Sequence, residues 1–479
     1  MSEGNFSRPE KSLREDKPTK IPTSKKNSSN WLLMGFGLSA IAVFSATIGA
    51  FLALSLSQTP LRQAKLTPAE EAVFNKEETL TFDNLQIPKL SRPVNILVLG
   101  IKVTTEDLPE QNHENLGYHA LVNSFEGLSD SMLLLRFDPD KDYVTVLSIP
   151  RDTKTFVAGK GITKINDANA LGGPALAAES VSSLLNDVPI DRYIRINVQG
   201  VEKFIDALGG VNLYVPQNMK YTDHSQHLYI DLKEGEQHLD GYKALQFLRF
   251  RYDAYGDIGR VQRQQTFIRA LIEQALSPRT ILKMPDILSV VRSHIDTNLT
   301  TNELIAIAGF TAQKNRSNIN MVMLPGDFNV PEEGELSYWL PNHRKISEVV
   351  AQHFDMEMES DYDSASNNSD LSNLRIAVQT TEDNQESAQK IVEYLRSQGY
   401  HQSFITQKFT TQPFLKTKIV AQQGDNFSAA KVRADLGIGE VIVESTGVLN
   451  SDITIQVGQD WPNINFDYPK ENSFKTVSY

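Results

Sequence analysis

The residues best suited to chemistry lie in one short segment, LRFRYDAYGDIGRVQRQQ (248–265), which holds four arginines. The chain as a whole is acidic, with a formal net charge of -12. An arginine run is commonly a solvated basic face. The alternative is a cradle for a strongly anionic group such as phosphate, because the guanidinium fork matches phosphate oxygens in a bidentate way. Arg249 and Arg251 are two residues apart in an expected extended run, so we expect them to share one face while Phe250 points into the core.

The second half of the segment has helical spacing. Arg260, Arg263 and Gln264 follow an i, i+3, i+4 pattern, which places them on one face of a helix. A helix that begins near Gly259 would add backbone N–H donors and a favourable dipole for an anion. A solvated face does not need such phasing, and the spacing therefore favours an anion cradle.

A carboxylate and a further arginine are expected at the end of a hairpin. SMLLLRF (131–137) and YVTVLSI (143–149) have strand character, and the residues between them have turn chemistry. We expect residue 137 to pair with residue 143, a register that brings Asp130 beside Arg151 at one end of the sheet. The alternative interpretation of this pair is a salt bridge at the sheet edge.

The elements that must position these side chains alternate between strands and helices, which is typical of an α/β fold or an α-β-α sandwich. Apolar runs and turn or cap residues predict strands at 94–100, 190–198 and 211–215, and helices at 174–186, 199–207 and from Asp240 to about Phe247.

Bulk composition limits the possible function classes. A length of 479 residues suggests about three domains, or one large domain with additional segments. The chain has no cysteine, which excludes disulfides, thiol nucleophiles and cysteine metal sites. The acidic balance argues against general nucleic-acid binding, which usually needs a basic surface.

One segment predicts a membrane anchor. Residues 31–57 contain no charged side chain and exceed the roughly 20 residues that span a bilayer as a helix. Residues 1–30 carry seven lysines or arginines and are expected to form a disordered cytoplasmic tail. The positive-inside bias then places the bulk of the chain outside the cytoplasm, on a single-pass anchor in a plasma membrane.

Several segments in order resemble the LytR-CpsA-Psr family. They are NILVLG (95–100), SDSMLLLRFDP (129–139), SIPRDT (148–153), TKINDANALGGP (163–174), DALGGVNLYVP (206–216), HLDGYKALQFLRFR (238–251) and GDIGRVQRQQ (256–265). The resemblance implies an α-β-α sandwich with a central mixed sheet. It also implies a membrane-anchored transferase that moves a phosphoglycan from a polyprenyl-pyrophosphate carrier onto peptidoglycan.

The resemblance also assigns roles to individual residues. The residues that match the family's pyrophosphate contacts are Arg151, Arg249, Arg251, Arg260 and Gln264, with Arg263 a weaker candidate. Asp130 matches a magnesium ligand, and Arg151 and Asp130 are the implied catalytic pair. Phosphoryl transfer depends mainly on positioning and charge stabilisation, which suits such a cluster.

One position departs from the family pattern. The family usually has an aspartate two residues after the glycine that ends the first strand, and Lys102 stands there in this chain. Three possibilities remain open: another carboxylate in the 102–128 loop replaces it, the lysine stabilises phosphate charge, or metal use is weakened. Mg²⁺ is therefore a less secure expectation than the arginines.

The remaining boundaries follow from composition and pattern. We expect a stalk at 58–91, a catalytic domain at 92–355, a linker at 356–373 and a small α/β domain at 374–465 that resembles the LytR C-terminal domain. Two other functions stay open for the whole chain. One is a pyrophosphatase that uses water as acceptor, and the other is a non-catalytic protein, or regulator, that binds lipid-linked glycans.

Overall fold

The computed structural model describes most of the chain beyond residue 60, with gaps. The described residues are 61–74, 88–102, 125–224, 228–250, 256–275, 277, 280, 283–314, 318–329, 336–356, 371–381, 385–406, 414, 416–421, 423–443, 447–448 and 450–461. None of the helices within these ranges is long and apolar enough to cross a membrane. The expected anchor at 31–57 and most of the expected linker at 356–373 lie outside them.

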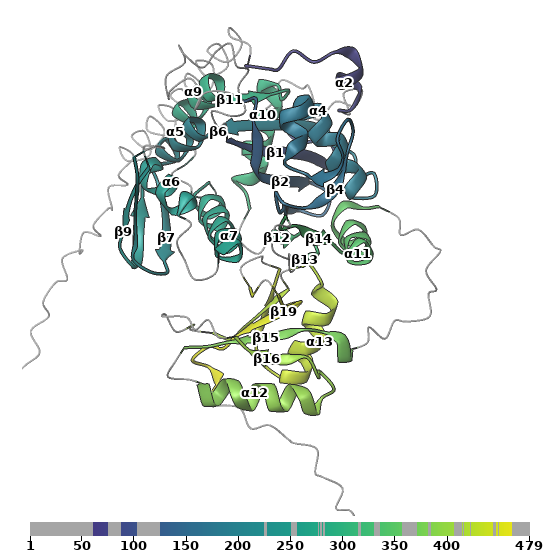
Figure 1. The fold of residues 1–479 in the computed structure, drawn as a ribbon, viewed down its shortest axis with the longest axis vertical. Coiled ribbons are helices and arrows are strands. Elements are labelled where there is room, and N and C mark those ends of the chain that lie inside the picture. Colours follow the sequence, from purple (N-terminus) through teal and green to yellow (C-terminus); the bar gives the residue numbers. More distant parts are fainter. Residues whose placement is uncertain are drawn as a thin grey trace, which may run out of the picture. The chain divides into compact units, whose positions relative to one another are not determined.

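A six-stranded mixed sheet forms the centre of the larger domain (Figure 1). Its order is β11 (Ile295–Thr297), β6 (Arg192–Asn197), β1 (Val94–Lys102), β2 (Leu128–Asp138), β3 (Tyr143–Ile149) and β12 (Ile319–Met323). The pairs β1–β6 and β3–β12 are parallel, and the other three pairs are antiparallel. The mixed sheet expected from the family resemblance is confirmed.

Helices cover both faces of this sheet. Alternate residues of β1 enter different cores: Leu97 packs in the core that contains residues of α4 (Asp167–Leu184) and α11 (His343–Phe354). Ile96 packs on the opposite face, with residues of α7 (Gly256–Ala275) and α10 (Thr301–Thr311). Because successive strand side chains point to opposite faces, a strand between two helical layers must be apolar on both sides. The predicted α-β-α sandwich is confirmed.

The predicted register of the β2–β3 hairpin is wrong by one residue. Asp138, and not Phe137, pairs with Tyr143, so the turn contains four residues. The Asp138 carboxylate accepts hydrogen bonds from the backbone N–H groups of Asp140 and Lys141, at 3.1 and 2.9 Å. An aspartate commonly initiates a turn by accepting such backbone hydrogen bonds, which explains why Asp138 is the last residue of β2 and not part of the turn.

Helix α4 begins earlier than the predicted start at 174, and it contains a break. Gly172 and Gly173 interrupt the helical conformation, and Gly173 has φ 64° and ψ -155°, a region open almost only to glycine. Pro174 then starts the second part of the helix, where its missing N–H costs nothing. The segment 174–184 matches the prediction, and 167–171 adds a turn next to the hairpin of β4 (Lys154–Val157) and β5 (Gly161–Lys164).

A smaller lobe has its own core. Its elements are α5 (Val198–Leu208), β7 (Val211–Val215), β8 (Met219–Asp223), β9 (Leu228–Leu232), β10 (Gly235–Leu239) and α6 (Gly241–Arg249). The helix predicted at 199–207 is confirmed as α5, and Gly209 ends it in the left-handed conformation with φ 87°. Asp240 caps α6 as predicted, because its side chain accepts a hydrogen bond from the Lys243 N–H at 2.9 Å.

Part of the expected stalk belongs to the larger domain. Phe74, just after α2 (Pro68–Ala72), is only 2% exposed and lies against Tyr193 with ring centroids 5.2 Å apart. The N–H of Ala64 donates to Asp296, at 2.6 Å. The stalk prediction is therefore wrong for residues 61–74. Composition suggested a stalk because this stretch is mostly polar, and its few apolar contacts come from residues distant in the chain.

The C-terminal part, taken by itself, is a small α/β unit. Its sheet has the order β16 (Ser403–Ile405), β15 (Ile376–Gln379), β19 (Ile453–Gln456), β17 (Lys418–Ala421) and β18 (Glu440–Ile442). Its helices are α12 (Gln385–Ser397) and α13 (Asn426–Leu436), which agrees with the small α/β domain predicted at 374–465. Other short elements of the chain are α9 (Met284–His294), β13 (Gly326–Phe328), β14 (Trp339–Pro341) and a 3-10 turn at Leu371–Asn373.

Candidate functional site

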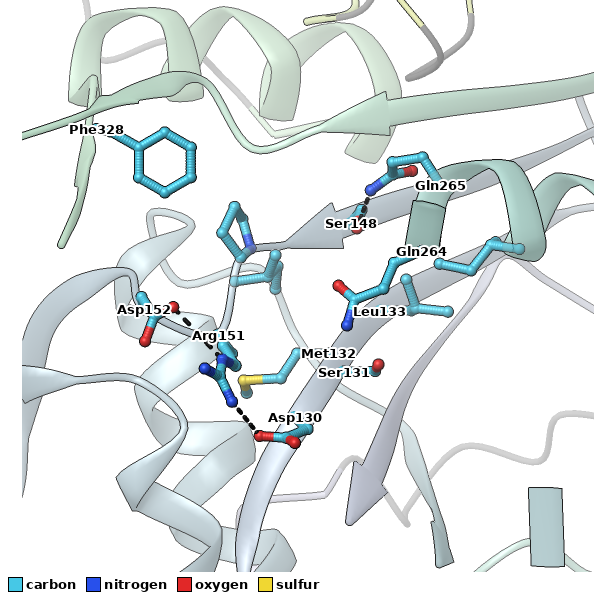
Figure 2. A pocket seen from close by; sticks show the side chains of 13 residues that line it. Asp130, Ser131, Met132, Leu133, Ser148, Arg151, Asp152, Gln264, Gln265 and Phe328 are labelled. Carbon is cyan, nitrogen blue, oxygen red and sulfur yellow. Dashed lines mark hydrogen bonds and ion pairs between the residues drawn. The ribbon is translucent and has the colours of Figure 1, made fainter. Parts of the chain in front are cut away.

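A pocket opens where β2 begins, β3 ends and α7 passes over the sheet (Figure 2). Its polar lining comes from Asp130, Ser131, Ser148, Arg151, Asp152, Gln264 and Gln265, and its apolar lining from Met132, Leu133, Ile149, Pro150, Ile268 and Phe328. The β2–β3 hairpin brings the two strands together, and α7 contributes residues from the middle of the helix. Charged groups thus lie beside an apolar floor, which is typical of ligand sites.

Arg151 lies between two carboxylates on the pocket wall (Figure 2). Its Nη1 donates to Asp130 Oδ1 at 2.5 Å, and its Nε approaches Asp152 Oδ2 at 3.4 Å. The side chains of Arg151 and Asp130 are 21% and 25% exposed, so both remain accessible from the pocket. The predicted meeting of Asp130 and Arg151 is confirmed, although it arises from a register one residue away from the predicted one.

Asp152 anchors this arginine to the neighbouring hairpin. Its Oδ1 accepts a hydrogen bond from Lys164 Nζ at 2.8 Å, and Lys164 ends β5. Asp152 therefore bridges an ammonium and a guanidinium, and it limits the rotation of Arg151. Sequence reasoning did not single out Asp152, although it directly follows Arg151 and its acidic type beside an arginine was a usable signal.

Helix α7 is fixed to β3 by a buried amide. Gln265 is 1% exposed, and its Nε2 donates to Ser148 Oγ at 2.6 Å. The neighbouring Gln264 extends its amide toward the centre of the pocket (Figure 2). Gln264 therefore lines the same pocket as Arg151, and its contact with pyrophosphate stays a prediction. Gln265 was not predicted, because a neutral amide gives no charge signal and its partner is 117 residues away in the sequence.

The arginines of the opening segment do not all lie in the predicted conformation. Arg249 is the last residue of α6, so the extended run predicted from this residue is wrong at Arg249. It is not among the described residues that line this pocket. Arg251 and the side chain of Arg260 lie outside the described part of the chain. Helix α7 begins at Gly256, three residues before the expected start near Gly259.

Arg263 is a core residue, and its prediction as a pyrophosphate contact is not supported by its position. Its side chain is buried, its Nη2 donates to the backbone carbonyl of Phe250, and its guanidinium lies 5.6 Å from the centroid of the Phe250 ring. Burial lowers the pKa of Arg263 to about 10, because a charge out of water is disfavoured. The predicted core position of Phe250, which is 3% exposed, is confirmed and explains where Arg263 points.

The described residues offer limited donors for a metal. Within the described part of the chain, no group of three or more histidine, aspartate or glutamate side chains is placed to hold one. Asp130 and Asp152 are the two carboxylates among the described residues that line the pocket, and Asp152 is also paired with Lys164. Mg²⁺ is often held by one or two carboxylates together with phosphate oxygens, so the site fits a metal shared with a bound pyrophosphate. The side chain of Lys102, and residues 103–124, lie outside the described part.

Comparison with family models and known proteins shows the family to which the chain belongs. A model of the LytR_cpsA_psr family matches residues 61–355. The chain belongs to the LytR_cpsA_psr family. A second family model, described as LytR cell envelope-related transcriptional attenuator, matches residues 373–461. The start of the first match agrees with residues 61–74 being part of the LytR_cpsA_psr domain, 31 residues before the predicted boundary.

Individual members of the LytR_cpsA_psr family are similar over most of their length. The polyisoprenyl-teichoic acid–peptidoglycan teichoic acid transferase TagU of Bacillus cereus is 31% identical over 320 residues, which cover 66% of this chain and 90% of that protein. The protein of the same name from Bacillus anthracis is 33% identical over 261 residues, covering 53% and 76%. The crystal structure of TagV from B. subtilis is 27% identical, covers 56% of this chain and 98% of that one, and has a TM-score of 0.46.

Proposed function

We propose that this chain is a membrane-anchored transferase that moves a phosphoglycan from a polyprenyl-pyrophosphate carrier onto peptidoglycan. The observation that carries the proposal is the Arg151 guanidinium, which is accessible from the pocket and held in place by Asp130 and Asp152. Relatives with this domain bear the name of teichoic acid transferases that act between a polyisoprenyl carrier and peptidoglycan, which agrees with an anion-binding pocket.

The reaction that suits the pocket is a phosphoryl transfer. A hydroxyl of the peptidoglycan attacks the phosphorus next to the glycan, and the bridging P–O bond to the second phosphate breaks. Polyprenyl phosphate leaves, the hydroxyl proton passes to a base, and the glycan remains joined to its acceptor through a phosphodiester. Preorganised donors stabilise the charge that develops on the phosphoryl oxygens, and Arg151 and Gln264, which line the pocket, would act as such donors.

Magnesium and further arginines complete the proposal. Asp130 would hold Mg²⁺ together with phosphate oxygens, and the bound ion would supply charge neutralisation to the pyrophosphate. Arg249, Arg251 and Arg260 remain proposed contacts to the pyrophosphate, on the basis of the family resemblance. Residues 31–57 would anchor the enzyme beside its lipid substrate with the bulk of the chain outside the cytoplasm.

The test is a transfer assay with the full-length protein in detergent. The substrates are a polyprenyl-pyrophosphate oligosaccharide, soluble peptidoglycan oligomers and Mg²⁺, and mass spectrometry detects the phosphate-linked conjugate. We expect conjugate from the wild type and strongly reduced conjugate from Asp130→Asn. Tight binding of the lipid-linked oligosaccharide without any turnover would instead support a non-catalytic binding protein.

A further inference from the structure

A small sheet beside the pocket presents an unusual outer face. The strands β4 and β5 form a hairpin, and the segment before β4 bridges to β14 through Thr153 and Trp339. Thr153 and Trp339 are buried, at 0% and 1% exposure, and therefore define the inner face of this sheet. Because side chains alternate along a strand, the neighbouring residues Lys154 and Tyr338 belong to the outer face.

The outer face carries large apolar groups in the open. Phe156 and Ile162 are directly paired across the hairpin, and they are 64% and 69% exposed. Lys154 pairs with Lys164 two residues further along. The ammonium groups of Lys154 and Lys164 both lie over the Tyr338 ring, at 5.5 and 5.7 Å from its centroid. We call these five residues the hairpin platform.

The hairpin platform is continuous with the pocket. Lys164 contacts Asp152, and Asp152 contacts the Arg151 guanidinium, so one chain of charged contacts leads from the platform to the proposed reaction centre. Asp152 lies in the turn directly before β4, two residues from Lys154, and its carboxylate holds Lys164 of the platform at 2.8 Å. A molecule seated on the platform therefore has one end beside Arg151.

We propose that the hairpin platform binds the acceptor, a peptidoglycan strand with its short peptides, and orients its hydroxyl toward the pocket. This inference rests on the proposed transferase function. The exposed ring of Phe156 and the side chain of Ile162 offer apolar surface for the C–H faces of sugars. The Lys154 ammonium offers a positive charge for peptide carboxylates, and no ion pair of Lys154 with a carboxylate is formed among the described residues.

The charge pattern favours this occupant over a lipid surface. Lys160 and Lys164 are each paired with an aspartate, at 2.7 and 2.8 Å, so the hairpin carries little net positive charge to attract anionic lipid. Lys164 is also held in place by its contacts with Asp152 and Tyr338. Fixed donors of this kind suit directional recognition of a polar polymer better than adsorption to a fluid membrane.

The first test is kinetic and uses the full-length protein in detergent. The variants are Lys154→Ala and the double variant Phe156→Ser with Ile162→Ser, which change exposed side chains. We expect each to raise the KM for soluble peptidoglycan oligomers about fivefold or more, while the kcat and the KM for the lipid-linked donor stay within about twofold. The matched control is Phe427→Ser on α13, where the side chain is 68% exposed, and it should change neither KM. An unchanged acceptor KM in both platform variants would overturn the proposal.

The second test measures binding without turnover. The chain has no cysteine, so Phe156→Cys introduces a single thiol for an environment-sensitive fluorophore in proteoliposomes. Peptidoglycan oligomers should change its emission, and anionic lipid alone should not. A blue shift on anionic lipid without any response to oligomers would overturn the proposal in favour of a membrane contact. If wild-type protein binds oligomers through the platform but yields no conjugate, the platform stands and the transferase function fails.

Discussion

Replacing Arg151 by alanine is the sharpest perturbation of the proposed site. Arg151 and Asp130 form a 2.5 Å contact with side chains that are about one fifth to one quarter exposed. Water can therefore replace the lost partner of Asp130, and we expect the free energy of unfolding to fall by only about 0–1 kcal/mol. The transition state loses more, because removal of one preorganised donor typically costs about 10²–10³ in kcat, or roughly 2.7–4 kcal/mol.

A lysine at the same position separates charge from geometry. Arg151→Lys keeps the positive charge but loses the planar fork that reaches Asp130 and Asp152 at different nitrogens. We expect its kcat to lie between those of the wild type and Arg151→Ala. Arg344→Ala is the matched control, since this arginine of α11 is 77% exposed and should leave kcat within about twofold.

The assay measures conjugate formation at saturating donor and acceptor, alongside thermal unfolding of each variant. The reasoning requires a large fall in kcat for Arg151→Ala with a nearly unchanged melting temperature. It would be refuted if Arg151→Ala kept more than about a third of the wild-type kcat, since the lost stabilisation would then be below about 0.7 kcal/mol. A collapse of the melting temperature that accounts for the whole loss of activity would refute it equally.

Three further predictions concern the parts that hold the pocket in place. Gln265→Ala should lower the free energy of unfolding by about 1–3 kcal/mol in urea titrations, because it leaves the buried Ser148 hydroxyl without its amide partner. An unchanged urea midpoint would contradict a stabilising role for the hydrogen bond between Gln265 and Ser148. Gly173→Ala should lower the free energy of unfolding by about 1–3 kcal/mol through backbone strain alone, because the nearest atom to an added Cβ is 4.0 Å away and no clash arises. An unchanged free energy of unfolding would show that the break in α4 tolerates residues other than glycine. The ion pair with Lys141 lowers the pKa of Asp355, so its stabilisation is complete above the ordinary aspartate pKa of about 3.9 and is lost as the pH falls through the lowered value. Asp355→Asn should therefore lower the melting temperature at pH 7 but much less near pH 3, and an equal deficit at both pH values would argue against the ion pair.

Much of the fold could be predicted, because local patterns and tertiary structure agree. Asp240 caps a helix through its own side chain, and Gly209 ends one through its left-handed conformation, so both signals are local. The β2–β3 hairpin was predicted correctly in kind but one residue out of register. Asp138 can serve either as a turn residue or as the last strand residue, and only its two backbone hydrogen bonds decide between them.

The site was predicted less completely than the fold. The contact between Asp130 and Arg151 followed from hairpin geometry, which spans few residues. Arg263 was placed wrongly, because helical spacing groups it with Gln264 although the contact with Phe250 draws its side chain into the core. Gln265 was missed because its partner is distant in the chain. The spacing of residues in the sequence does not show which side chains are buried or which partners they have far along the chain. Those two properties distinguish Arg151, which is accessible from the pocket, from Arg263 and Gln265, which are buried.

The central claim is that the pocket transfers a phosphoglycan to an acceptor and does not simply hydrolyse the carrier. The most direct measurement follows the release of polyprenyl phosphate by the full-length protein, with and without peptidoglycan oligomers, while conjugate is quantified in the same samples. A transferase releases polyprenyl phosphate only when acceptor is present, and in equal amount to the conjugate. Equal release without acceptor, accompanied by free glycan phosphate, would contradict the claim and identify water as the acceptor.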